Sequence, residues 1–411
     1  MFYGWWILAL VFLSSSFYSA VVLYGFTAYF SPLNAEFGWS YTAISVVASI
    51  RGLESGLVDF IIGFALDRFG GRRIASIGCF VIGVGFLMLS RVNSLGMFYL
   101  LFIIIFIGSS SLGSVFVAHI VAQWFQKKFG LVYGIVVAGF GAGGSAVPGI
   151  VHLLDNLGWR NTFIIFGVSA LILSSVLAVF LRNKPEDIGS LPDGLSEDKL
   201  QDTNADLNGI NTASHRLKSD YSAREAISTL PFWILAYVGA AVSFSVLMVI
   251  THVMPYLEQM GYTRNMAGFV AMMIPVLSVV GRIGLGWVSD FVSVKTVIIL
   301  GLICQAIGIL LFFNANLTIL LIPFIVLFGI AFGGNRVIQM KILREYYGKA
   351  WIGSIAGLQI GTSAILGLGG PLLAGYVFDN YNSYSIAWVV NIVLLMIGLP
   401  LLLVIKNPQT K

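Results

Sequence analysis

Long uninterrupted runs of apolar residues limit what this chain can fold into. A helix needs about 20 predominantly apolar residues to cross the hydrocarbon part of a bilayer, and such runs recur throughout the 411 residues. The short alternating segments that are typical of membrane-spanning strands are not found in them. The sequence therefore predicts an all-α membrane protein with twelve transmembrane helices, at about 5–31, 42–66, 74–91, 97–124, 129–154, 161–181, 231–257, 265–289, 296–313, 317–343, 349–378 and 384–405.

Other features argue against several classes of protein. The first run is too long, and its start "MFYGWW" too poor in basic residues, for a cleaved signal peptide. Cys79 and Cys304 lie in apolar runs and predict neither a disulfide framework nor a metal site. The net charge of +5 comes without a basic helix, so nucleic acid is not an expected partner. The sequence shows no nucleophile elbow, phosphate-binding loop or metal-spaced cluster, and we expect neither an enzyme nor a cofactor.

The distribution of lysine and arginine predicts an orientation. Successive connections between the runs would lie on alternate sides of the membrane. Most lysines and arginines outside the runs, from Arg68 to Lys406, lie in the connections on one side, whereas the connections on the other side hold only Arg91, Arg160 and Arg264. Because basic residues accumulate on the cytoplasmic side of a membrane protein, both termini are expected in the cytoplasm. The expected location is the plasma (inner) membrane, where the chain would be a multi-pass integral protein.

One long polar stretch, 182–229, separates the sixth run from the seventh. It is rich in Ser, Asn, Asp and Gly, as in "SEDKLQDTNADLNG", and a flexible cytoplasmic linker is the simplest interpretation. A regulatory segment is the alternative. Within it, Ser222 and Glu225 have the spacing of a capping box and predict the start of a short helix. The expected organisation is an N-terminal bundle of six helices at 1–181, the linker at 182–229 and a C-terminal bundle of six helices at 230–411.

The two halves resemble each other at a constant offset of 223 residues. This offset relates Asp67 in "GFALDRFGGRR" to Asp290 in "GWVSDFVSVKT", and Pro148 to Pro371. Glycine matches such as Gly63 to Gly286 are weaker evidence in a chain with 46 glycines. Two parallel repeats of six helices are typical of a large class of secondary transporters, and the sequence predicts two pseudo-symmetric bundles of this kind.

The segment "GFALDRFGGRR" (63–73) resembles the signature loop of the major facilitator superfamily. The resemblance implies the major facilitator fold and a loop that locks one conformation of the two halves. The residues fit this role, because glycine allows close helix contact, a carboxylate at a helix end can pair with basic residues, and arginines can anchor the turn at the membrane surface. We expect the lock to comprise Gly63, Asp67, Arg68, Arg72, Arg73 and, in the second half, Asp290.

Four other segments resemble the branch that contains monocarboxylate transporters and the oxalate:formate antiporter. They are "GFTAYFSPLNAEFGWSYTAIS" (25–45), "QWFQKKFGLVYGIVVAGFGAGG" (123–144), "LRNKPEDIG" (181–189) and "THVMPYLEQMGYT" (251–263). In that branch an arginine in the eighth helix binds the carboxylate, and Arg282 stands at the matching place. The sequence departs from the branch at Ser278, where monocarboxylate transporters often have an aspartate. It also has no lysine in the eleventh helix, which makes oxalate exchange a weaker hypothesis.

Charged residues inside the apolar runs identify the expected binding region. Placing one at bilayer depth costs about 2.5–3.5 kcal/mol on insertion scales, unless it faces water or a partner. The sixth, ninth and twelfth runs contain no charged residue and the third has one only at its last position, Arg91, in keeping with the outer helices of the resembled fold. The interior groups are Arg51, Glu54 and Asp59 in the second run, His119 in the fourth, Arg282 in the eighth and Arg336 in the tenth.

Their spacing predicts a common depth. Asp59 and Arg282 lie eight residues before an aspartate at a helix end, Arg336 lies nine before Glu345 and His119 eight before Lys127. At about 1.5 Å per residue, all four would lie roughly 12–14 Å from the cytoplasmic boundary and line one hydrated chamber. The expected substrate-binding residues are Arg282, Asn335, Arg336 and His119, and the expected proton-coupling residues are Asp59, Glu54 and His119.

Each of these residues also has a structural interpretation. Arg282 could instead be the partner of a buried carboxylate such as Asp59, although substrate binding is the favoured interpretation. Arg336 would be equally well explained as a residue that snorkels or pairs within the protein. Arg51 and Glu54, three positions apart, can pair on one helix face, and His119 can be a packing residue. His252 is expected to have a gating or structural role. The glycines of "AGFGAGG" and "GTSAILGLGG" are expected to let helices five and eleven approach helices eight and two.

These features together predict a secondary active transporter that works by alternating access. The expected substrate is a small organic anion, with a monocarboxylate and proton symport as the leading hypothesis. Anion exchange, or transport of another small metabolite, is the alternative within transport. A membrane sensor of this fold that binds ligand without moving it is the alternative of a different class. The expected assembly is a monomer in the lipid bilayer.

Overall fold

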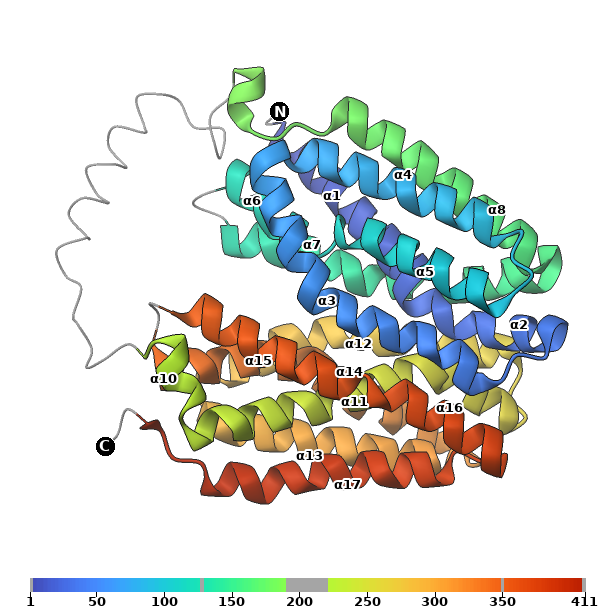
Figure 1. Ribbon diagram of the computed structural model, residues 1–411. Helices are drawn as coiled ribbons and strands as arrows, with labels where there is room; N and C mark the ends of the chain where they lie inside the picture. Colours follow the sequence, from blue (N-terminus) through green and yellow to red (C-terminus); the bar gives the residue numbers. More distant parts are fainter. Residues whose placement is uncertain (1–2, 126–128, 190–220, 349–350, 409–411) are drawn as a thin grey trace.

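The computed structural model describes residues 3–125, 129–189, 221–348 and 351–408. Within these ranges every regular element is a helix, which confirms the predicted all-α class. Figure 1 shows the long helices running roughly alongside one another in two groups, with those before residue 181 in the upper group and those after residue 230 in the lower one.

The first group begins with a helix that changes pitch along its length. It starts as α1 (Gly4–Tyr18), continues through a π-helical turn (Ser19–Tyr24) and a 3-10 turn (Gly25–Tyr29), and ends as α2 (Phe30–Phe37). The helices that follow are α3 (Tyr41–Phe69), α4 (Gly71–Leu89), α5 (Leu95–Ser110), α6 (Ser114–Trp124), α7 (Phe129–Gly144) and α8 (Val147–Phe180).

The second group is preceded by short elements and contains seven longer helices. The short elements are η3 (Pro185–Ile188) and α10 (Ala223–Ile227). The longer helices are α11 (Leu230–Gln259), α12 (Arg264–Val288), α13 (Val294–Phe313), α14 (Leu321–Tyr347), α15 (Ile352–Gly367), α16 (Gly369–Tyr381) and α17 (Ser385–Val404), with a 3-10 turn at Thr318–Leu320 before α14.

Ten helical segments of the described residues are long and apolar enough to cross a membrane. One of them, Val132–Phe180, has 49 residues and contains Gly158, whose φ of 76° and ψ of 161° interrupt the helix. The ten do not include α3, which carries Arg51, Glu54 and Asp59 inside its span. If Gly158 divides the long segment into two crossings and α3 is a further crossing, the helices match the twelve that the sequence predicts.

Hydroxyl side chains begin several of the helices. Ser40, Ser94, Thr263 and Ser293 each accept a hydrogen bond from a backbone N–H in the first turn of the helix that follows, a contact worth about 1 kcal/mol. The predicted capping box is confirmed at the start of α10, where Ser222 and Glu225 bond to each other reciprocally. These bonds from Ser222 hold the pKa of the exposed Glu225 carboxyl below its usual value.

Each group of helices has an aromatic core of its own. In the first, the ring of Phe102 packs 5.5 Å from Phe26 and 4.9 Å from Phe98. In the second, the ring of Phe312 packs 4.7 Å from Tyr256 and 4.3 Å from Phe324. Each group therefore packs around aromatic side chains that it supplies itself, and rings also meet between the groups, as at Tyr41 and Phe378.

Candidate functional site

The two groups of helices, called here the N-half and the C-half, meet mainly at one end of the bundle. This far end holds the connections at Gly38, Gly261 and Asn382, whereas the terminal end holds the start of α1, the turn at Gly70 and the end of α17. Figure 1 shows the two halves converging toward the far end, on its right. The contacts that join the halves there involve side chains that are far apart in the sequence.

Asp379 of α16 caps the first turn of α3 in the other half. Its carboxylate accepts hydrogen bonds from the backbone N–H groups of Tyr41, at 2.9 Å, and Thr42, at 2.7 Å, and also from the Thr42 hydroxyl. A carboxylate is favoured at a helix N-terminus because of the unpaired N–H groups and the helix dipole. The capping group of α3 thus comes partly from the opposite half.

Arg264, at the start of α12, bonds to the N-half at two points. Its Nε donates to Asp155 at 2.8 Å and one terminal nitrogen donates to the Ala28 carbonyl at 3.1 Å. The other terminal nitrogen donates at 3.1 Å to Glu258 of its own half, which in turn accepts a hydrogen bond from Ser31 of the N-half. We call Arg264, Asp155, Glu258, Ser31 and Asp379 the far-end clasp.

His252 of α11 is fully buried beside the clasp. Its Nε2 lies 3.0 Å from the hydroxyl of Ser45 in α3 and 3.0 Å from the carbonyl of Pro371, and its Nδ1 lies 3.1 Å from the Tyr384 hydroxyl. A carbonyl only accepts hydrogen bonds, so these partners assign the proton to Nε2 and fit a neutral imidazole that accepts from Tyr384 at Nδ1. The gating or structural role expected for His252 stays a prediction.

Contacts between the halves become sparse toward the terminal end. Gly141 and Gly144 of α7 face Pro275 of α12, and a Cβ at Gly144 would lie 2.1 Å from the Pro275 ring. Helix five thus approaches helix eight, as the sequence predicts. At the second glycine segment helix eleven does approach helix two, where Ser49 of α3 donates to the Leu368 carbonyl at 2.8 Å. The role expected of the glycines is wrong, however, because Gly367 and Gly370 face α11 rather than α3.

Several hydrogen bonds join the halves. Among those between described residues, the one nearest the terminal end is made by Arg282. A terminal nitrogen of its guanidinium donates at 3.3 Å to the Val137 carbonyl of α7. The side chain is half-buried, and its charge also acts on the Tyr133 hydroxyl of the same helix. No carboxylate of a described side chain lies within ion-pair distance of it.

The structure does not test the predicted chamber as a whole. The side chains of Glu54, Asp59 and Arg336 lie outside the described part of the molecule, although their backbones belong to α3 and α14. Asn335 is described and is only 1% exposed. Its amide donates to Gln305 of α13 at 2.9 Å, and it faces that helix rather than Arg282. The structure therefore does not bring Asn335 and Arg282 together.

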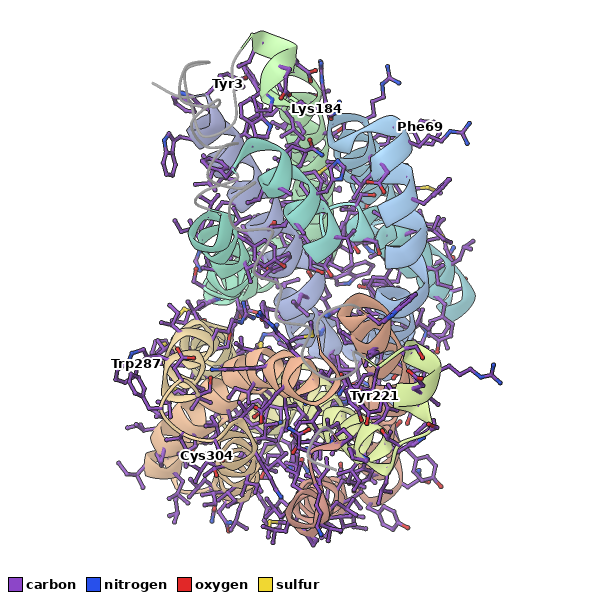
Figure 2. All side chains as sticks on the ribbon, turned by 90° about the vertical axis from the view of Figure 1, so that its left-hand side faces the viewer. Tyr3, Phe69, Lys184, Tyr221, Trp287 and Cys304 are labelled. Carbon is purple, nitrogen blue, oxygen red and sulfur yellow. The ribbon has the colours of Figure 1, made fainter. Side chains whose placement is uncertain are left out.

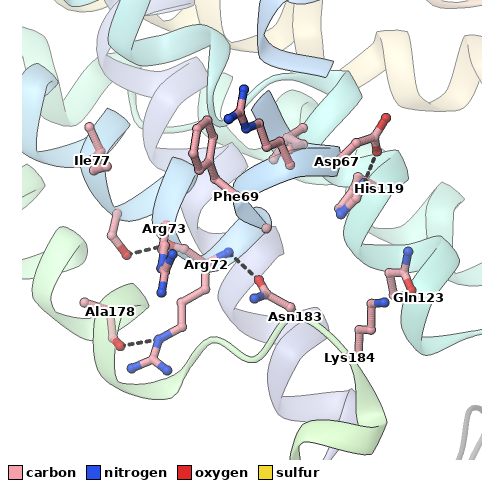
Figure 3. A pocket seen from close by; sticks show the side chains of 14 residues that line it. Asp67, Phe69, Arg72, Arg73, Ile77, His119, Gln123, Ala178, Asn183 and Lys184 are labelled. Atoms are coloured by element: carbon pink, nitrogen blue, oxygen red, sulfur yellow. Dashed lines mark hydrogen bonds and ion pairs between the residues drawn. The ribbon is translucent and has the colours of Figure 1, made fainter. Parts of the chain in front are cut away.

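His119 lies elsewhere than its predicted depth. Its Nδ1 is 3.4 Å from the carboxylate of Asp67, at the terminal end of the N-half (Figure 3). The depth prediction assumed a continuous helix from His119 to Lys127, but α6 ends at Trp124 and Phe125 has an extended backbone. His119 is thus five residues, or about 7.5 Å, from the helix end rather than the predicted eight residues, and its ion-pair partner is Asp67 rather than a group near Arg282.

The expected lock residues do not connect the halves in this conformation. Asp67 is 78% exposed and contacts His119, while Asp290 pairs with Lys341 of its own half. Arg68 lies over the ring of Phe69, and the Arg72 backbone and side chain bond to Asn183 and Ala178. Arg73 is exposed. The close contact expected at Gly63 is not formed, since a Cβ there would lie 3.6 Å from Val115.

The geometry is that of two bundles closed at one end. The clasp and His252 hold the far end together, and no hydrogen bond or ion pair between described side chains joins the halves on the terminal side of Arg282. Figure 2 views the molecule from the terminal end, with Lys184 in the upper half and Trp287 in the lower one. Among the described residues no group of His, Cys, Asp and Glu could hold a metal ion.

Comparisons with known proteins agree with this fold. A family model described as "Major Facilitator Superfamily" matches residues 7–292 and 233–411. The MFS-type transporter YcxA of Bacillus subtilis (strain 168) is 24% identical over 91% of this chain and 88% of its own. Monocarboxylate transporter 12 of Xenopus laevis is 25% identical over 93% of this chain and 85% of its own.

A solved structure with a similar fold is that of a bacterial homologue of the human lysosomal transporter Spinster, in an inward-facing and unoccupied conformation. It covers 97% of this chain, and this chain covers 96% of it, with a TM-score of 0.73 and 15% sequence identity. At this identity the likeness concerns the fold alone.

Proposed function

Because this chain belongs to the major facilitator superfamily, we propose that it is a transporter for a small organic anion, with monocarboxylates as the expected class. The position of Arg282 carries the proposal. It is a permanent cation, half-buried where α12 meets α7 of the other half, and its described polar partner is a carbonyl at 3.3 Å. A guanidinium offers a planar pair of N–H donors that matches a carboxylate.

The relatives support the same class of substrate. Transporters whose names specify monocarboxylates resemble this chain over most of its length, including transporter 12 of Xenopus laevis. Arg282 is also the arginine to which the branch resemblance assigns carboxylate binding. Arg336, Asn335 and His119 remain proposed contributors to binding. Of these, Asn335 would have to leave Gln305, and His119 would have to leave Asp67, to meet a substrate near Arg282.

Uptake into proteoliposomes tests this proposal. We expect labelled monocarboxylates such as pyruvate to accumulate faster under an inward proton gradient, with the membrane potential clamped, because Asp59 and Glu54 are carboxylates within a spanning helix and are the proposed proton carriers. Asp59→Asn should flatten this pH dependence. Flux that ignores the pH gradient but needs a trapped counter-anion would favour exchange, and binding without any flux would favour a sensor.

We also propose that the terminal end faces the cytoplasm, with the chain in the plasma (inner) membrane. The basis is the excess of basic residues in the connections at this end. A single cysteine introduced at Ser196 should react with a membrane-impermeant reagent only from the cytoplasmic side, and one at Asn156 only from the opposite side. Reaction of both from one side would contradict the proposed topology.

A further inference from the structure

A concavity of about 890 Å³ lies at the terminal end of the N-half, away from the interface with the C-half. Its walls are the end of α3, the start of α4, the end of α6 and the residues that follow α8. Figure 3 shows Asp67, His119 and Lys184 on one side of it and Arg72 and Arg73 on the other. All the described residues that line it belong to the N-half or to the residues directly after α8.

Most of the charged residues that line the concavity are cations. Arg68, Arg72, Arg73 and Lys184 contribute positive charge, and Asp67 is the one carboxylate among the described residues that line it. Asp67 contacts His119 rather than any of the four cations. No described carboxylate forms an ion pair with these arginine and lysine side chains, and they are therefore available to bind an anion.

Two further features favour an anion here. The Arg72 guanidinium is held by its Nε, which donates to the Ala178 carbonyl at 2.6 Å, so that its terminal nitrogens remain for another partner. The helix α4 starts beside it at Gly71 and has no acidic residue in its first turn, where the backbone N–H of Arg72 donates to the Asn183 side chain at 2.8 Å. The dipole of such a helix start adds to the attraction of the side chains for a phosphate.

An apolar surface leads out of the concavity along α4. Ile77 lines the concavity and is 60% exposed, and Phe80, one turn further along, is 55% exposed. Both belong to a helix that is long and apolar enough to cross the membrane. A free phosphate compound would gain nothing from these side chains, whereas the acyl chains of a lipid would cover them and its headgroup would reach the cations.

We propose that this concavity is a binding site for an anionic phospholipid, with the phosphate among Arg72, Arg73 and Lys184 and the acyl chains against Ile77 and Phe80. Basic pockets between helices at a membrane surface bind such headgroups. The proposal is independent of the transported substrate, because it involves a different surface from the one at Arg282.

Lipid binding to the purified full-length protein tests the proposal. We expect dihexanoyl phosphatidylglycerol, titrated below its micellar concentration and followed by native mass spectrometry, to bind at least about tenfold more tightly than dihexanoyl phosphatidylcholine. The double variant Arg73→Gln, Lys184→Gln should lose this preference, since each basic residue at a membrane surface contributes roughly a fivefold factor. Ile77→Ser should weaken the lipid but not glycerol 1-phosphate.

Arg224→Gln is the matched control, because Arg224 is an exposed arginine on α10, outside the concavity. It removes one charge and should leave the preference for phosphatidylglycerol intact. Asp67→Asn tests the opposite sign and should tighten phosphatidylglycerol binding, because it removes the carboxylate. Equal binding of the two lipids, or an equal loss in Arg224→Gln, would overturn the proposal. Binding of glycerol 1-phosphate as tight as that of the lipid would make this a site for a soluble anion and overturn the lipid assignment.

Discussion

Arg282→Gln should nearly abolish carboxylate binding in a protein that still inserts and purifies. Glutamine removes the charge and the planar pair of donors, and each hydrogen bond to a charged group contributes about 1.5–3 kcal/mol. A loss of two such bonds corresponds to at least a hundredfold weaker binding. Arg282→Lys keeps the charge but loses the bidentate geometry, and should weaken binding less. The measurement is carboxylate affinity together with the melting temperature of each variant.

The competing interpretation, that Arg282 neutralises the buried carboxylate of Asp59, predicts a different pattern. Removing one member of a buried ion pair costs about 3–5 kcal/mol, so Arg282→Gln would then express poorly. The double variant with Asp59→Asn would recover the fold, because it removes the stranded charge. If a well-folded Arg282→Gln protein binds carboxylates as the wild type does, the proposal of an anion site at Arg282 is wrong.

The features that the sequence predicts well are local ones. The apolar runs require helices whatever their neighbours, and the spacing of Ser222 and Glu225 is enough to predict the capping box found at α10. The resemblance of "GFALDRFGGRR" to a family loop likewise needs only adjacent residues. The family model that matches residues 7–292 and 233–411 confirms the major facilitator assignment.

Depth and direction of side chains were harder to predict, because they depend on where helices end and which face meets a neighbour. The prediction placed His119 too far from the end of its helix, because α6 ends at Trp124. The sequence does contain a feature related to the direction in which the Asn335 side chain points, namely two glycines that precede it. Gly329 and Gly333 lie four residues apart, and both face α12. Asn335 is two positions further on, about 200° around the helix, and so faces α13 instead.

The far-end clasp had no signal that a single sequence could supply. Arg264 and Asp155 are separated by 109 residues, and Asp379 and Thr42 by 337. Their pairing depends on how two bundles dock, and each residue alone is an ordinary polar or charged residue. The clasp nevertheless carries much of the polar contact between the halves, and this leads to a second prediction.

Arg264→Gln should loosen the closed far end and expose the interface behind it. The substitution removes the bonds to Asp155 and Ala28 of the N-half. Because Arg264 is partly buried, we expect a loss of about 1–2 kcal/mol rather than the value of a fully exposed pair. In a protein with two conformations, this changes the ratio of their populations by roughly fivefold to thirtyfold, in favour of the state that is open at the far end.

A cysteine at Thr27 reports on this opening. Thr27 is only 2% exposed, and its hydroxyl accepts a hydrogen bond from the Met254 backbone of the opposite half. With Cys79 and Cys304 replaced by serine, Thr27→Cys should be almost unreactive toward a membrane-impermeant maleimide in the wild-type background. Its labelling from the far side should become roughly fivefold to thirtyfold faster in Arg264→Gln, because only the opened state admits the reagent.

Arg160→Gln is a closely matched control for this experiment. Arg160 is also an arginine at the far end, and it bonds to a carboxylate, Glu36, and to the carbonyl of Ser90, but both partners belong to its own half. Its loss removes comparable contacts without separating the halves, so the Thr27→Cys labelling rate should stay at the wild-type level. Equal acceleration by Arg160→Gln and Arg264→Gln would mean that loss of either arginine merely loosens the far end. No acceleration by Arg264→Gln would mean that Asp379 and the packing around His252 hold the far end closed without Arg264.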